Sequence, residues 1–279
     1  MKTDTLQSTA GDARSLVLIG AVCGDIIGSC YEFAPVKRLD FDLFTPTSQF
    51  TDDTVCSVSV ADALTRGLLF AESLRHWCRK YPRESYGYHF CQWMLSDAQG
   101  PYNSWGNGSA MRVSAVGAYG TSFDEVMRLA RESAAVTHSH PEGIKGAQAT
   151  AATIYYALCG RSKDEIRTMI ETRFGYDLTR RYADIQPGYS FDVSCQGSVP
   201  ESIIAFLEST DYESAIRMAV AYGGDADTQG AITGGIAAAY YGEIPREILD
   251  EAISRLPADL RETISTFNRA AAARNTPTL

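Results

Sequence analysis

The chain has 279 residues, of which 45% are hydrophobic and 21% are charged, and this composition excludes a disordered or collagen-like protein. A chain of this size buries about three-quarters of its surface on folding, which supports a hydrophobic core without stabilising cross-links. Its 34 acidic and 25 basic residues give a net charge of −9, and it shows no basic stripe of the kind that binds nucleic acid non-specifically.

Apolar residues at helical spacing predict helices over 52–70, 144–158, 203–222 and 229–241, and at least one more within 247–273. Pro141 is typical of a first helical turn, and a new cap near 209–211 is expected to interrupt the third segment. Strand signals are poor, because the alternation of Leu39, Phe41 and Leu43 is too short for more than a hairpin arm. We therefore expect an all-α fold of many short helices.

Glycines recur at helical spacing in two segments, as Gly20, Gly24 and Gly28 and as Gly230, Gly234 and Gly235. In a soluble protein this spacing predicts close approach of helix backbones, and a phosphate-binding interpretation is weaker because the dinucleotide fingerprint is missing. Segments 96–109 and 174–200 are predicted loops that would form the walls of a substrate cleft. We expect one domain over 14–275, preceded by a flexible tail at 1–13.

Seven cysteines are scattered without a C-x-x-C motif, so a zinc knuckle or a redox motif is not expected. The apolar run at 15–27 is interrupted by Asp25 and is too short to span a bilayer. These features predict a reduced, cytoplasmic protein without a membrane partner.

Two acidic motifs open predicted helices: T-D-D-T at 51–54 and G-G-D-A-D-T at 223–228. Each alone is typical of a helix cap, but a cap explains one aspartate and not two. Clustered aspartate and threonine oxygens suit Mg²⁺, Mn²⁺ or Ca²⁺ rather than zinc. An EF-hand is rejected because Ile236 stands where a bidentate glutamate is required.

Three further features have open interpretations. Glu32 alone is a surface glutamate by default, and W-G-N-G-S-A-M-R at 105–112 is either an ordinary turn or a loop that lets backbone amides bind an anion. T-H-S-H-P-E at 137–142 favours a helix cap with one core histidine. No G-x-S-x-G elbow, P-loop or Cys/His nucleophile pairing occurs.

Taken together and in this order, five segments resemble the ADP-ribosylglycohydrolase family: G-A-V-C-G-D-I-I-G-S-C-Y-E, F-T-D-D-T-V, W-G-N-G-S-A-M-R-V-S, T-H-S-H-P-E-G-I-K-G-A and G-G-D-A-D-T-Q-G-A-I-T-G-G. They span residues 20–235, and the combination of T-D-D-T with G-G-D-A-D-T is the part of the resemblance that is specific to this family. The resemblance implies an orthogonal all-α bundle with a site for two Mg²⁺ or Mn²⁺ ions.

The resemblance also implies roles for individual residues. Metal ligands would be Thr51, Asp52, Asp53, Asp225, Asp227 and Thr228. Glu32, Asp53 and Asp225 would be catalytic. The ADP-ribose diphosphate would bind a loop containing Gly106, Asn107, Gly108, Ser109 and Met111, with His140 near a ribose or phosphate. Two dications would nearly cancel the five carboxylate charges of such a site.

The function that the resemblance implies is hydrolysis of the glycosidic bond between ADP-ribose and an acceptor, with a protein arginine as the first expectation. Serine-linked, nucleic-acid-linked and small-molecule ADP-ribose stay open as substrates. A non-catalytic ADP-ribose-binding module is the alternative class. A third interpretation is an immunity protein that both blocks a toxin ADP-ribosyltransferase and reverses its action on the target.

Overall fold

The structure, a computed structural model, describes residues 13–274, which form α-helices and one isolated backbone bridge between Gly106 and Ser194 but no β-strand. The all-α prediction is therefore confirmed. In chain order the helices are α1 (Arg14–Ser29), α2 (Asp52–Arg66), α3 (Phe70–Lys80), α4 (Tyr88–Leu95), α5 (Gly108–Met111), α6 (Ser114–Tyr119), α7 (Phe123–Ala135), α8 (Pro141–Leu158), α9 (Lys163–Phe174), α10 (Tyr182–Ile185), α11 (Cys195–Glu208), α12 (Tyr212–Ala221), α13 (Ala226–Tyr241), α14 (Arg246–Ser254) and α15 (Ala258–Ala272).

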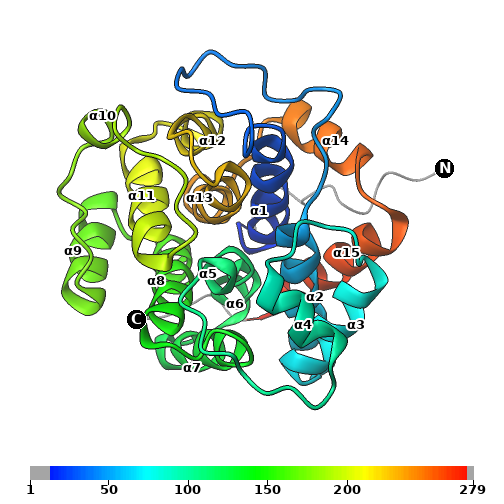
Figure 1. Cartoon of the computed structure of the whole chain (residues 1–279). Helices are drawn as coiled ribbons and strands as arrows, with labels where there is room; N and C mark the ends of the chain where they lie inside the picture. Colours follow the sequence, from blue (N-terminus) through cyan, green and yellow to red (C-terminus); the bar gives the residue numbers. More distant parts are fainter. Residues whose placement is uncertain (1–12, 275–279) are drawn as a thin grey trace.

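Helices α1 and α13 lie side by side at the centre of the molecule (Figure 1). A Cβ atom on Gly24 would overlap the Gly230 carbonyl group, and one on Gly20 would lie 2.7 Å from the Gly234 carbonyl oxygen. The predicted backbone-to-backbone approach is confirmed, because only glycine permits it at these positions. This antiparallel contact brings the C-terminal end of α1 to the N-terminal end of α13.

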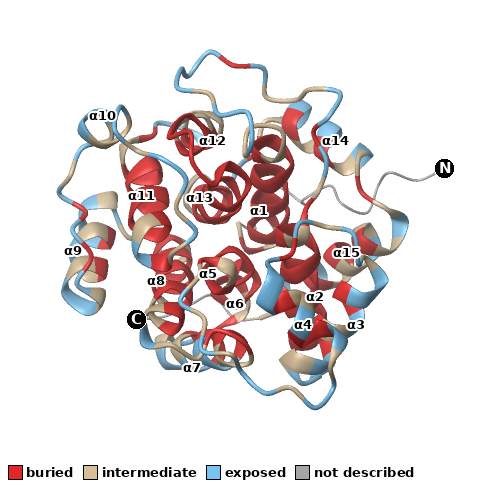
Figure 2. Cartoon of the chain, in the orientation of Figure 1, coloured by how far each residue is buried: buried red, intermediate tan, exposed pale blue. Residues whose placement is uncertain are grey.

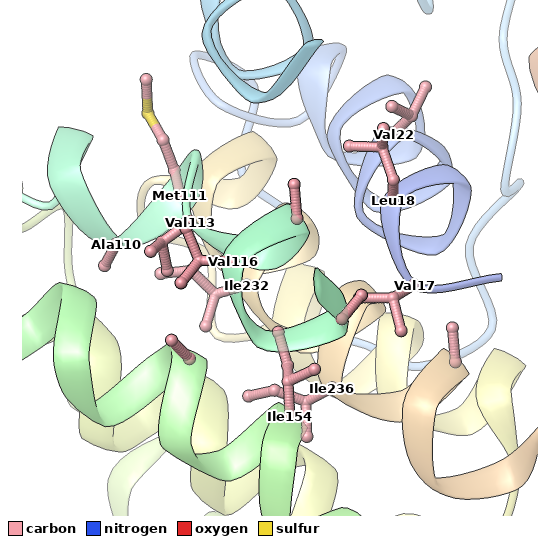
Figure 3. Close-up of a cluster of buried hydrophobic side chains, with 14 of the residues drawn as sticks. Val17, Leu18, Val22, Ala110, Met111, Val113, Val116, Ile154, Ile232 and Ile236 are labelled. Atoms are coloured by element: carbon pink, nitrogen blue, oxygen red, sulfur yellow. The ribbon is translucent and has the colours of Figure 1, made fainter. Parts of the chain in front are cut away.

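Surrounding helices bury the rest of the core (Figure 2). Figure 3 shows apolar side chains gathered from α1, α6, α8 and α13, including Val17, Val116, Ile154 and Ile236, all of which are fully buried. The central helices α1 and α13 are nearly all apolar, and a helix that is hydrophobic on every side is a buried one.

Two predicted boundaries are wrong. The helix predicted over 52–70 ends at Arg66, because Gly67 adopts a left-handed conformation with φ of 67° and α3 begins only at Phe70. The loop predicted over 174–200 contains α10 and ends early, since the Ser194 hydroxyl accepts the Gly197 N–H and caps α11. Segment 39–43 forms no hairpin arm.

Other predicted elements are confirmed. Helix α8 begins at Pro141, and α11 and α12 are separated by a cap at Asp211 whose carboxylate accepts the Ser214 N–H. Most of the predicted tail (1–12) and the last residues (275–279) lie outside the described range. No helix within residues 13–274 combines the length and apolar character that crossing a bilayer requires.

Candidate active site

The two acidic helix starts lie beside each other and line one cavity of about 440 Å³. The Thr228 hydroxyl, in the first turn of α13, donates a hydrogen bond of 2.9 Å to Asp53 Oδ2 in the first turn of α2. Asp52, which starts α2, and Asp227 both line this cavity. Motifs far apart in the chain therefore form a single acidic wall.

Glu32 completes this wall from the segment that follows α1. Glu32, Asp225 and Asp227 each supply one carboxylate oxygen, and these three oxygens lie within 4.8 Å of one another. The glycine contacts between α1 and α13 explain this arrangement, because they hold the end of α1 against the start of α13. Three carboxylates at this spacing match the hard oxygen ligands of a divalent cation.

None of the ion pairs formed by residues 13–274 includes a carboxylate of this wall. Burial raises the pKa of Asp225 to about 6, and burial together with the charge of Asp227 raises the pKa of Glu32 to about 8. Burial and mutual repulsion also raise the pKa values of Asp52, Asp53 and Asp227 well above their usual range. The wall therefore carries negative charge that forms no ion pair with another described residue, and a bound cation or protons would offset it.

The glycine-containing loop forms the neighbouring wall of the cavity. Gly106, Asn107, Gly108 and Met111 line it. The Asn107 side-chain amide donates to Asp225 Oδ2 at 2.7 Å and to Ser198 Oγ at 3.0 Å, which ties the loop to the acidic wall. Ser109 is fully buried outside the cavity lining, and its hydroxyl donates to the Gly143 carbonyl at 2.7 Å. It therefore holds the loop against α8.

The structure brings His138 to the cavity, and not His140 as the resemblance implied. His140 caps α8, where its Nδ1 accepts the Glu142 N–H at 3.1 Å. His138 Nδ1 lies 2.8 Å from the Thr137 hydroxyl oxygen, and burial lowers the pKa of this histidine well below its usual range. A neutral imidazole is thus available at the cavity, and the sequence pattern alone does not distinguish the two histidines.

Thr51 lies behind the acidic wall and not among the residues that line the cavity. It is the N-cap of α2: its hydroxyl oxygen accepts the Asp53 N–H at 3.2 Å, and its proton is donated to Asp25 at 2.7 Å. Asp25 is a residue that the motif search did not single out, since its partners lie in another helix. Arg112, the last residue of the W-G-N-G-S-A-M-R motif, is a buried cation in the cavity wall and donates to the Thr137 hydroxyl at 2.9 Å.

Exposed apolar side chains form the mouth of the cavity. The rings of Phe33 and Phe191 stack with centroids 6.5 Å apart and are 79% and 50% exposed. Trp105 and Val193 also line this mouth and are about half exposed. Both predicted loop regions, 96–109 and 174–200, therefore contribute to the cavity walls.

Comparisons with known proteins show the family to which the chain belongs. A model of the family described as ADP-ribosylglycohydrolase matches residues 9–276. Human ADP-ribosylhydrolase ARH3 is 27% identical, over 83% of this chain and 87% of the human protein. The ADP-ribosylarginine hydrolase Tri1 of Serratia proteamaculans is 24% identical, over 89% of this chain and 77% of its own. A solved structure described as an ADP-ribosylglycohydrolase-related protein complex has the same fold, with a TM-score of 0.72, 24% identity, and coverage of 93% of this chain and 98% of its own. The chain thus belongs to the ADP-ribosylglycohydrolase family.

Proposed function

We propose that this protein is a hydrolase that depends on divalent cations and cleaves the glycosidic bond between ADP-ribose and a protein arginine side chain. One observation carries the proposal: five carboxylates and a glycine-containing loop line a single cavity. Membership of the ADP-ribosylglycohydrolase family supports the same activity.

The acidic wall fits two Mg²⁺ or Mn²⁺ ions by the chemistry of its donors. The proposed ligands are Thr51, Asp52, Asp53, Asp225, Asp227 and Thr228. When bound, such ions supply Lewis acidity and a template for the ribose hydroxyls. Thr51 suits this role in one respect, because its hydroxyl proton is directed toward Asp25 and an oxygen lone pair stays free.

Glu32 is the proposed proton-transfer group. It is the one wall carboxylate supplied by the segment after α1, and it lies close to both Asp225 and Asp227. Its raised pKa places its proton exchange near neutral pH in the cation-free protein, and nearby positive charge would lower that pKa and favour its action as a base toward water. Asp53 and Asp225 are held in place by Thr228 and Asn107, so the wall is preorganised.

The glycine-containing loop is the proposed diphosphate site. Gly106 and Gly108 have no side chains to obstruct a ligand, and His138 Nε2 lies 3.1 Å from the position that a Cβ atom on Gly108 would occupy. The Gly106 and Asn107 N–H groups already donate to Ser104 Oγ and to the Val193 carbonyl, so the donors suited to phosphate oxygens are the first N–H groups of α5 and the neutral imidazole. A ligand bound along this loop would place its distal ribose toward the acidic wall.

The acceptor is assigned from the mouth of the cavity. Exposed aromatic rings line this mouth, and a guanidinium group stacks favourably on such rings. The similarity to Tri1, an ADP-ribosylarginine hydrolase, points the same way.

The test is to incubate the protein with defined arginine-, serine- and nucleic-acid-linked ADP-ribose, with Mg²⁺, with Mn²⁺ or with EDTA. We expect release of ADP-ribose from the arginine linkage with either cation and none in EDTA. Asp227→Asn should abolish release, whereas Asp62→Asn should not, because Asp62 lies on α2 outside the cavity and accepts the Trp77 indole N–H. Retained ligand without turnover would instead indicate a binding module, and unchanged release in EDTA would contradict the cation requirement.

A further inference from the structure

Asp25 is a fully buried carboxylate in α1 that has no basic partner among the ion pairs of the described residues and does not line the cavity. It accepts four hydrogen bonds from two residues that bracket the paired aspartates of α2. The Thr51 hydroxyl donates to Oδ1 at 2.7 Å, and the Thr51 N–H donates to Oδ2 at 3.0 Å. The Thr54 N–H donates to Oδ2 at 3.2 Å, and the Thr54 hydroxyl donates to the same oxygen.

These hydrogen bonds determine where the threonine protons point. Each hydroxyl has one proton, and Asp25 accepts both of them. The Thr51 oxygen also accepts the Asp53 N–H, so its one remaining lone pair can serve only as an acceptor or a ligand. Asp25 therefore constrains the backbone and the hydroxyls of the turn from which Asp52 and Asp53 project.

A buried carboxylate is an energetically unfavourable group for joining one helix to another. A buried, unpaired negative charge costs several kcal/mol, and the charge of Asp25 also raises the pKa values of Asp52, Asp53 and Asp227. A neutral side chain could join α1 to α2 without adding to this repulsion. The position of the charge, directly behind the acidic wall, is favourable only when cations are bound there.

We propose that Asp25 is a positioning residue that orients the 51–54 turn, through Thr51 and Thr54, for divalent-cation binding. This inference rests on the proposed cation site but not on the identity of the substrate. If Asp25 only joined α1 to α2, its substitution would lower the stability of the protein and leave the cation affinity unchanged.

The test measures Mn²⁺ affinity of the full-length protein by titration, together with thermal unfolding with and without Mn²⁺. Groups that orient metal ligands typically change affinity 10- to 100-fold, so we expect Asp25→Asn to weaken Mn²⁺ binding by about 10- to 100-fold. Asp62→Asn is the control, because it removes another buried carboxylate of α2 whose partners are Trp77 on α3 and Arg66, and this variant should bind Mn²⁺ as the wild type does. Its own loss of stability would show what an altered buried carboxylate does without the positioning role.

A second pair of variants keeps the test decisive if Asp25→Asn does not fold. Thr54→Val keeps the Asp25 charge but removes one hydroxyl donor, and should weaken Mn²⁺ binding; Thr54→Ser restores the donor and should restore affinity. An Asp25→Asn or Thr54→Val protein that unfolds at lower temperature yet binds Mn²⁺ within about threefold of wild type would overturn the inference. Wild-type protein that binds Mn²⁺ but releases no ADP-ribose would refute the proposed activity and leave the inference standing. Wild-type protein that binds no Mn²⁺ would overturn the inference.

Discussion

Asp225→Asn should stabilise the cation-free protein while removing its activity. Burial raises the pKa of Asp225 from 3.8 to about 6, so the folded state binds this proton more tightly than the unfolded state does. Stability is therefore lost as the pH rises from about 4 to about 6, by about 3 kcal/mol in total at about 1.36 kcal/mol per pH unit. Asparagine avoids this cost, and its carbonyl oxygen can still accept the Asn107 amide.

The assay is thermal unfolding in EDTA, followed by circular dichroism, at about pH 7.5 and about pH 4. A gain of about 3 kcal/mol corresponds to an increase in Tm of roughly 6–12 °C for a chain of this size, and this is the upper limit that we expect at the higher pH. At the lower pH the wild-type carboxyl is protonated, so the two proteins should unfold at similar temperatures. Saturating Mn²⁺ should reverse the order, since a ligand at about 1,000 times its Kd adds about 4.1 kcal/mol to the protein that binds it, which exceeds the gain of about 3 kcal/mol.

Two results would refute this reasoning. One is an Asp225→Asn protein that is less stable than wild type in EDTA at the higher pH. The other is a gain in stability that persists unchanged at the lower pH, which would show that the charge of Asp225 is not its source. Asp62→Asn, altered outside the cavity, should show neither the gain nor the reversal by Mn²⁺.

The remaining predictions concern the helix contact, the histidines and the mouth. Gly24→Ala should lower the free energy of unfolding by at least about 1–3 kcal/mol, because the new Cβ atom would overlap backbone atoms of α13. A Cβ atom on Gly87 would meet nothing within 4 Å, so Gly87→Ala should leave the stability unchanged. Equal effects of the two substitutions would contradict the packing argument. His138→Ala should raise KM roughly 2- to 10-fold, the value of one hydrogen bond, while His140→Ala should cost only about 1 kcal/mol of stability as a lost cap. Phe191→Ala should leave Tm nearly unchanged, since the ring is half exposed. The substitution should lower kcat/KM more for an ADP-ribosylated protein than for free ADP-ribosyl-arginine. An equal loss for both substrates would exclude a contact between Phe191 and the protein acceptor.

Local patterns in the chain predicted α2, α8, the α11–α12 segment, α13 and a C-terminal helix, together with the residue types of the site, but they predicted none of α3 to α7, α9 or α10. Apolar spacing predicted α8 and α13, and Pro141 and the cap near Asp211 marked boundaries that the structure confirms. These features depend on neighbours within one or two turns, so they can be read from the sequence. The helix predicted past Gly67 was wrong because a left-handed glycine ends α2 in the middle of a continuous apolar pattern.

Contacts between distant segments depended on the folded chain. Two motifs with paired aspartates suggested a shared site, but only the close packing of α1 on α13 explains why Glu32 lies beside Asp227. Asp25 and His138 were missed for the same reason: their roles depend on partners or a cavity contributed by other helices. Residue spacing specifies the local backbone, whereas the direction of a side chain in a cavity depends on how whole helices pack.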